Sequence, residues 1–427
     1  MYASPARNAG RRALAGLFTA AMVVGGGSAL SMPAANAQES PLAQITGSIG
    51  ATQFAQNCVA LDAGLYQTAY SETENAVYVT RSVGRPPVTE STLTKVDADS
   101  LEVRDSIDPA VNDESSGART AVYGVAVDDA NGYVWTTNTR DNTVAVYDAK
   151  TLDLVKQYES GLVDHARDVA VDPETGKAYV SSAASEEGAV YEFDGNDLDA
   201  APAKIELPDL ANTVSLDLDP ATGALYTVDL GGPHAAKIDT RSGNEVTTYD
   251  LGDSVEAASG VTIDTENGNI WAIDQTTGSA VVVDEESGDV VKNFETGEGA
   301  LNAKYDDVTG LVYVSNRTAN NITVYDAATF EQVGDLPAGP NAELGQTPNH
   351  VSVDGKGNAF SVNKFAPEAG EGAGKNQLCR ITPDGGPLSS VTGSLDQITG
   401  SLEGLGEQVP ADAAPAAGAP AEGAPAQ

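Results

Sequence analysis

Hydrophobic and polar residues alternate in short runs along most of the chain, and the runs return at a regular interval. Residues 310–333 align without gaps with residues 132–155, which lie 178 positions earlier, and ten of the 24 aligned residues are identical. This offset corresponds to four units of roughly 44 residues, within the ~40–45 residues of WD40-like repeats. The chain is therefore predicted to be a repeat protein with further copies between these two.

A short turn with Asp at its start and Gly four residues later marks the copies. Five copies have this turn, at Asp128/Gly132, Asp172/Gly176, Asp219/Gly223, Asp264/Gly268 and Asp306/Gly310. A shorter version at Asp354/Gly357 and a degenerate one at Ser71/Asn75 bring the count to seven.

Each turn joins two alternating runs, and two further runs follow before the next copy. The second run carries an aromatic residue at a fixed place, which is Tyr78, Trp135, Tyr179, Tyr226, Trp271, Tyr313 or Phe360. Val, Ile, Thr and Tyr at period two, bounded by Gly, Asp and Asn, are strand signals. Four short strands repeated seven times predict an all-β fold, a seven-bladed β-propeller with four-stranded antiparallel blades.

The second runs also share a motif. They read "YVSN" at 313–316, "WTTN" at 135–138 and "YVSS" at 179–182. This motif resembles the YVTN repeat of YncE-like seven-bladed β-propellers, and the resemblance extends over roughly residues 66–385. The superfamily includes cytochrome- and quinoprotein-associated propellers, lactonases and streptogramin lyases. The resemblance therefore implies the fold and leaves the chemistry open.

The resemblance also implies how the ring closes. The seventh copy supplies three clear strands, and YncE-like propellers often pair an N-terminal strand with the last blade, which removes an open edge. Here "QFAQNCVAL" would pair with "NQLCRIT", and the two cysteines of the mature chain, Cys58 and Cys379, lie in these segments. Two cysteines in an exported protein usually form a disulfide. We expect this bond, with Cα atoms about 4.4–6.8 Å apart; two free thiols are the alternative.

The ends of the chain differ in composition from the repeats. Residues 1–37 resemble an export signal, with Arg11 and Arg12 before an apolar stretch and "ANA" as a cleavage site. Sec and twin-arginine export both fit, and an uncleaved membrane anchor is the alternative. Residues 38–52 are predicted to be a linker, 53–385 the propeller, 386–410 an amphipathic or weakly ordered segment, and 411–427 a disordered Ala/Pro-rich tail. A heptad stripe at 391–405 would suit contact with a partner.

Charge narrows the range of partners. Removing residues 1–37, which hold three Arg and no acidic residue, leaves 20 basic and 62 acidic residues and a net charge of −42. Such a surface repels phosphate backbones, and no run of Lys and Arg follows the signal, so we do not expect a nucleic-acid partner. No other run of ~18 apolar residues occurs, so we expect no membrane span in the mature chain. The protein is expected to be secreted or associated with the cell envelope.

Candidate site residues follow from the predicted blades, because the first strand of each blade lines the central channel. The positions four residues before each turn are Gln67, Gly124, Asp168, Ser215, Gly260, Asn302 and His350, and the positions just before these are Tyr66, Tyr123, Arg167, Val214, Ser259, Leu301 and Asn349. From this double ring we predict that a ligand is bound by Tyr123, Arg167, Asp168, Asn302, Asn349 and His350. The alternative is that these side chains are solvated or bond neighbouring loops.

The sequence contains no recognisable catalytic motif, so no catalytic residue is assigned. The three histidines, His165, His234 and His350, come from different blades, and we expect neither a metal site nor a cofactor. We therefore expect a non-enzymatic propeller of the cell envelope that binds a small ligand or a protein. A lactonase- or lyase-like enzyme is the alternative, with His350 or His165 as general acid or base and Asp168 as an anchor. An electron-transfer accessory is a third interpretation.

Overall fold

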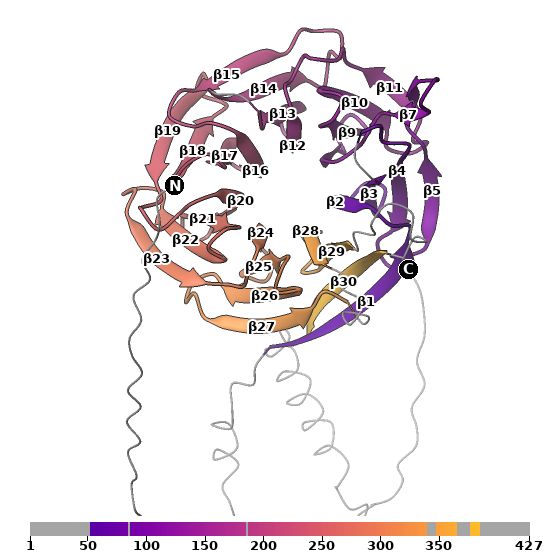
Figure 1. Cartoon of the computed structure of the whole chain (residues 1–427). Coiled ribbons are helices and arrows are strands. Elements are labelled where there is room, and N and C mark those ends of the chain that lie inside the picture. Colours follow the sequence, from indigo (N-terminus) through magenta and orange to yellow (C-terminus); the bar gives the residue numbers. More distant parts are fainter. Residues whose placement is uncertain (1–51, 84–85, 185–186, 340–346, 365–375, 385–427) are drawn as a thin grey trace, which may run out of the picture. The chain divides into compact units, whose positions relative to one another are not determined.

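Seven four-stranded antiparallel sheets form the ring that the sequence predicts (Figure 1). The computed structural model describes residues 52–83, 86–184, 187–339, 347–364 and 376–384. The segments 1–37, 386–410 and 411–427, and all of 38–52 except Thr52, lie outside the described residues, so the predictions made for them stay predictions. No described segment forms a helix with the length and apolarity needed to span a bilayer.

The strands follow one another around the ring in chain order. Blade 1 contains β2 (Leu65–Ser71), β3 (Ala76–Val83), β4 (Glu90–Asp97) and β5 (Val103–Ile107). Blade 2 contains β8 (Val125–Asp128), β9 (Tyr133–Asn138), β10 (Thr143–Asp148) and β11 (Leu154–Gln157). Blade 3 contains β12 (Ala166–Asp172), β13 (Lys177–Ser182), β14 (Gly188–Asp194) and β15 (Ala203–Leu207). Blade 4 contains β16 (Thr213–Asp219), β17 (Ala224–Asp229), β18 (His234–Asp239) and β19 (Glu245–Asp250).

The remaining blades complete the circle. Blade 5 contains β20 (Ala258–Asp264), β21 (Asn269–Asp274), β22 (Ser279–Asp284) and β23 (Val290–Glu295). Blade 6 contains β24 (Ala300–Asp306), β25 (Leu311–Asn316), β26 (Asn321–Asp326) and β27 (Gln332–Pro337). Blade 7 contains β28 (Thr347–Val353), β29 (Ala359–Lys364), β30 (Asn376–Asp384) and the N-terminal strand β1 (Gln53–Leu61). Between blades 1 and 2 the chain forms the small hairpin β6 (Val111–Asp113) and β7 (Ala118–Arg119).

The turn between the first and second strands explains the Asp and Gly of the repeat. Gly132 and Gly176 both have φ of +71°, a backbone conformation that L side chains rarely adopt. Asp128 accepts a hydrogen bond from the backbone N–H of Asn131, which closes the turn from its other end. In the degenerate first copy Asn75 takes the glycine position with φ of +45°, since Asn is one of the few other residues that tolerate it.

Hydrophobic packing joins the blades to one another. Eight clusters of buried side chains are found among the described residues, and seven of them combine strand residues of two successive blades. The repeated aromatic residues are central to these clusters. Trp271 of blade 5, for example, is fully buried in the same cluster as Ala303 and Val312 of blade 6. The fixed place of the aromatic residue thus reflects a contact between blades that recurs around the ring.

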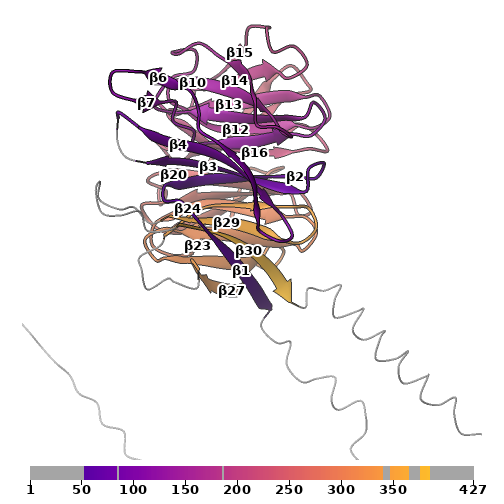
Figure 2. The same cartoon turned by 90° about the vertical axis from the view of Figure 1, so that its right-hand side faces the viewer.

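The N-terminal strand closes the ring as predicted. Strand β1 pairs antiparallel with β30, and Figure 2 shows the two strands side by side. Cys58 lies directly opposite Cys379, and the two form a disulfide. Their Cα atoms are 4.0 Å apart, slightly closer than expected, because directly opposed residues of antiparallel strands can approach to about 4.5 Å even without a bond. On the other side of the closure, Phe360 of blade 7 packs in one cluster with Val77 and Val79 of blade 1.

Candidate functional site: the mouth of the channel

The first strand of each blade lies nearest the centre of the ring (Figure 1). A small cavity of about 30 Å³ lies where these strands begin, and its lining consists of Gln67, Arg167, Asp168, Val214, Ser215, Ser259, Leu301, Asn302, Asn349 and His350. All ten belong to the double ring derived from the sequence. We call this end of the channel the mouth, and the opposite face, which carries the turns between first and second strands, the turn face.

Five of the six predicted ligand-binding residues line the mouth cavity, and Tyr123 does not. The Tyr123 side chain is buried, and its ring meets the ring of Tyr66 edge to face with centroids 4.3 Å apart. Tyr123 therefore supports Tyr66 from behind, since Tyr66 is the more exposed of the two rings.

Polar side chains of the inner layer bond the next blade. We define the inner layer as Gln67, Gly124, Asp168, Ser215, Gly260, Asn302 and His350. Each first strand is an edge strand toward the channel, so its backbone N–H groups need partners outside its own sheet. Five inner-layer side chains accept such a bond, namely Gln67 from Val125 (3.1 Å), Asp168 from Leu216 (3.0 Å), Ser215 from Val261 (3.3 Å), Asn302 from Val351 (2.8 Å) and His350 from Thr68 (3.4 Å).

Glycine occupies the other two inner-layer positions because the next blade comes too close for a side chain. A Cβ atom on Gly124 would lie 2.8 Å from the backbone oxygen of Arg167, and one on Gly260 would lie 2.8 Å from that of Leu301. The missing side chain at Gly124 also leaves room for Gln67, which donates a hydrogen bond to Asp168 two blades away (3.2 Å). The inner layer is thus a nearly continuous belt of bonds between blades.

His350 is held as a neutral ring. Its Nδ1 accepts the Thr68 N–H, so the ring proton resides on Nε2. Burial, together with the charges of Lys304 and Arg167, lowers the pKa of His350 to about 3. Burial raises the pKa of Asp168, although the Leu216 N–H favours its charged form. In the described part of the chain, Asp168 bonds Gln67, Val169 and Leu216, His350 bonds Thr68, and no hydrogen bond joins Asp168 to His350.

Basic side chains gather above the inner layer. Lys364, the last residue of β29, places Nζ 3.3 Å from the centroid of the Tyr66 ring. Burial and the charges of Arg317 and Arg167 lower the pKa of Lys364 to about 7. Burial, with Tyr123 beside it, raises the pKa of Tyr66 to about 12. The charges of Arg167 and Arg140 act in the opposite direction on the pKa of Tyr66.

We call Arg140, Arg167, Arg317 and Lys364 the basic rim. Within the described residues, none of the four takes part in an ion pair. Arg140, Arg317 and Lys364 were not among the predicted site residues, but the sequence contains a signal for them. Arg317 and Lys364 directly follow the Asn of the second strand, and Arg140 follows it by two residues. Because the same loop of every blade opens at the mouth, basic residues at this place in three copies must meet there.

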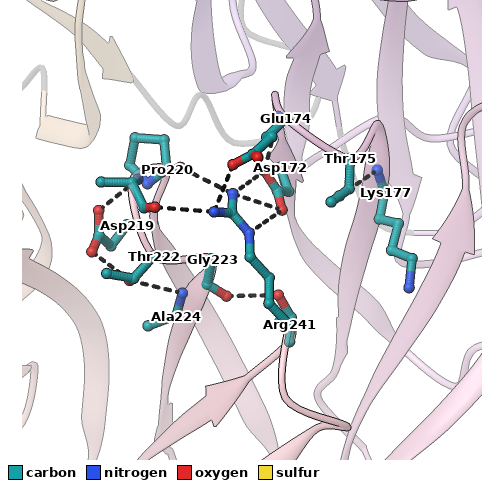
Figure 3. A network of polar contacts seen from close by, with 12 residues as sticks. Asp172, Glu174, Thr175, Lys177, Asp219, Pro220, Thr222, Gly223, Ala224 and Arg241 are labelled. Carbon is teal, nitrogen blue, oxygen red and sulfur yellow. Dashed lines mark hydrogen bonds and ion pairs between the residues drawn. The ribbon is translucent and has the colours of Figure 1, made fainter.

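Basic residues on the turn face have acidic partners. Figure 3 shows Arg241, which follows β18 in blade 4, reaching the buried carboxylate of Asp172 in blade 3. The guanidinium lies 3.0 Å from Asp172 and 2.6 Å from Glu174. It also donates to the backbone oxygens of Pro220 (3.1 Å) and Ala221 (3.0 Å). Arg241 therefore joins two blades and has little capacity left for a ligand.

A larger cavity of about 330 Å³ lies further along the first strands, toward the turn face. Asp168, Asn302 and His350 line both cavities, so the inner layer separates them. Aliphatic residues such as Val171 and Leu218 dominate its wall, and Lys304 forms an ion pair there with Asp217. This cavity was not predicted from the sequence, although Asp217 and Lys304 occupy a place where most copies have Ala, Ser or Thr.

In the described residues, no three or more His, Cys, Asp or Glu side chains lie close enough together to hold a metal ion. His234 lies 3.9 Å from Asp229, and His350 lies in the inner layer.

Comparison with known proteins agrees with the fold and provides no activity. No family model matches the chain. The uncharacterized protein YncE of Salmonella typhi is 26% identical over 334 residues, and that of Salmonella typhimurium is 25% identical over 334 residues. Each alignment covers 75% of this chain and 89% of the relative.

Two solved structures have a similar fold. A streptogramin B lyase matches with a TM-score of 0.59 at 12% identity, covering 78% of this chain and 98% of the lyase. The virginiamycin B lyase from Staphylococcus aureus matches with a TM-score of 0.59 at 13% identity, covering 77% and 99%. At such identities the likeness extends to the fold alone. The repeated motif, the seven-bladed ring and the two YncE relatives together confirm that this chain resembles the YncE-like β-propellers.

Proposed function

We propose that this protein is a non-enzymatic, ligand-binding β-propeller of the cell envelope, which holds a small ligand at the mouth of its channel. The observation that carries this proposal is the basic rim, in which side chains from four blades lie around the mouth and form no ion pair with any described acidic residue. Groups that serve only the fold are normally paired, as Arg241 is with Asp172. Unpaired groups gathered at the opening of a channel are suited to contact with something outside the chain.

The inner layer supports binding rather than catalysis. A general acid or base works best when its pKa lies near the operating pH, whereas His350 has a pKa lowered to about 3 by burial and nearby charges. Asp168 already accepts hydrogen bonds from Leu216, Val169 and Gln67. These side chains form a rigid floor, and a rigid floor pre-organises the residues above it.

Export is supported by two independent features. Residues 1–37 have the order of a signal sequence, with basic residues, an apolar stretch and a small-residue cleavage site. The Cys58–Cys379 disulfide would persist in an oxidising compartment and is unusual in a reducing one.

The second candidate is a lyase- or lactonase-like enzyme, which the similar fold of two streptogramin-type lyases favours. It would need His350 or His165 as acid or base and Asp168 as an anchor. It also requires the inner layer to rearrange, because His350 Nδ1 and both Asp168 oxygens are already engaged between blades.

Native mass spectrometry of the exported protein, purified from the envelope without added ligand, tests the proposal. We expect a bound small molecule in the wild type that is lost in Arg167→Gln and retained in Lys356→Met, which removes a charge from the turn face. The same preparations are incubated with a lactone and with a streptogramin B, each with Mg²⁺. Turnover that depends on His350 would replace the proposal with the enzymatic candidate. The binding proposal would be contradicted if the wild type carried no ligand, or if every ligand it carried were also present in Arg167→Gln.

A further inference from the structure

The mouth carries a specific charge arrangement, and we infer that its ligand is a small, multiply charged oxyanion, bound by Arg167, Arg317 and Lys364 beside the Tyr66 ring. This inference rests on the proposed function and adds the chemical class of the ligand.

The three cations are brought together by the fold. Arg167 belongs to β12 of blade 3, Arg317 follows β25 of blade 6, and Lys364 ends β29 of blade 7. Arg167 lines the mouth cavity, and the charges of Arg167 and Arg317 both act on Lys364. Lys364 lies over the ring of Tyr66, which neighbours Gln67 of the cavity lining. Three basic side chains separated by up to 197 positions in the chain are therefore brought to one opening of the channel.

This arrangement is unfavourable for the protein alone. Like charges in a partly buried site repel, and Lys364 has also lost much of its hydration. The chain contains 62 acidic residues for 23 basic ones, so carboxylates are abundant, and Arg241 has two of them. No ion pair reaches Arg167, Arg317 or Lys364 from the described residues. A bound anion would neutralise the repulsion.

The shape of the donors indicates the type of anion. Arg presents a planar fork of N–H donors that matches the oxygens of a carboxylate or phosphate, and Lys adds a compact point charge. Three cations are matched best by a ligand that carries more than one negative charge. The cavity of about 30 Å³ beneath them has space for one or two waters. The ligand therefore rests on the rim, against the Tyr66 ring, and does not enter the channel.

The rest of the surface restricts ligand size. With a net charge of −39 for the whole chain, and of −42 without residues 1–37, the protein repels long polyanions, whose charges extend far beyond the mouth. A small anion needs only the local field of the rim, because surface charges more than about 10 Å away are largely screened at 0.1 M salt. The inferred class is thus small phosphate esters and polycarboxylates rather than anionic polymers.

The inference is tested by titrating the exported protein with inorganic phosphate and, separately, with citrate at pH 6.5. Calorimetry is performed against a sodium chloride control of equal ionic strength. We expect at least one of the two probes to bind, and to bind at least tenfold more weakly to Arg167→Gln and to Lys364→Met. Lys356→Met, which removes a lysine charge on the turn face, should bind as the wild type does.

Two results would overturn the inference. One is that neither probe binds more strongly than chloride. The other is that Lys356→Met weakens binding as much as Lys364→Met does, since this would indicate a general charge effect. If the molecule retained in native mass spectrometry is neutral and is lost in Arg167→Gln, the proposed function stands and the anion inference fails. If no molecule and no anion is bound, both fail.

Discussion

The inner layer and the basic rim are neighbours at one mouth, but their polar groups have opposite surroundings. In the inner layer, five side chains accept backbone N–H groups of the next blade, and His350 is neutral. At the same mouth, Arg167, Arg317 and Lys364 have no ion-pair partner among the described residues, and the charges of the two arginines lower the pKa of Lys364. The inner layer thus has a structural role in joining the blades, and the rim is the part left available to a ligand. Arg241 on the turn face, which pairs with Asp172 and Glu174, serves for comparison as a basic residue with a structural role.

The largest expected effect concerns the disulfide that closes the ring at blade 7. Both regions depend on this blade, which supplies His350 to the inner layer and Lys364 to the rim. Replacing Cys58 and Cys379 together by Ser opens a loop with a sequence separation of 321. The chain-entropy model gives a loss of up to about 6 kcal/mol in the free energy of unfolding, measurable by guanidinium denaturation. Protease sensitivity should appear first at β1, where blade 7 loses its covalent link. An unchanged denaturation midpoint would show that the ring is closed by packing alone.

The next effect is the pH dependence of the free energy of unfolding, which should involve Lys364 of the basic rim and not the inner layer. The folded pKa of Lys364 is about 7, below its ordinary value of 10.5, so between these values the unfolded chain binds a proton that the folded chain lacks. The free energy of unfolding therefore rises with pH in this window, by about 1.4 kcal/mol per pH unit for this one group. Denaturation of the wild type and Lys364→Met from pH 7.5 to 9.5 should reveal the difference in slope. Lys356→Met should keep the wild-type slope, and equal slopes for all three would reject the rim as a repulsive cluster.

A change within the inner layer should cost stability without involving the rim. Asp168→Ala leaves the Leu216 N–H without its acceptor in a buried site, which costs about 2 kcal/mol in the free energy of unfolding. Asp168→Asn should cost less, because it keeps an acceptor oxygen and removes a charge that burial disfavours. Urea denaturation of the three proteins checks this order. If Asn is as costly as Ala, the charge of Asp168 is what matters, and its role between blades has been misread.

The smallest effect compares two arginines directly. Arg241→Gln removes the partner of the buried Asp172 and should lower the melting temperature measurably. Arg167→Gln breaks no side-chain bond in the described residues, so its free energy of unfolding should change by no more than about 0.5 kcal/mol. Thermal melts of both variants at low salt test the difference. An equal loss in the two would indicate that Arg167 also serves the fold and would weaken the division between rim and structure.

Much of the fold and part of the site could be predicted from the sequence because both follow the repeat. The turn of Asp and Gly gives the number of blades, and the fixed aromatic residue identifies the second strand. Counting back from each turn gives the residues that line the mouth, and all ten residues around the cavity are among those predicted. Tyr123 does not line that cavity, since the pattern gives the place of a residue along the chain but not the direction of its ring, and its role in ligand binding stays a prediction.

The sequence by itself determined which residues stand at equivalent places in the seven blades, because each blade must repeat the same short-range geometry. It also located both cysteines on strands that meet only if the ring closes. Only the tertiary structure decided what the equivalent residues do. Gln67 can reach Asp168 because Gly124 leaves space between them, and this depends on the distance between blades. Arg167, Arg317 and Lys364 appear in the sequence as isolated residues of an acidic chain. They form a cluster because closure of the ring brings the loops of blades 3, 6 and 7 to one opening, and charges interact through distance in space rather than through separation along the chain.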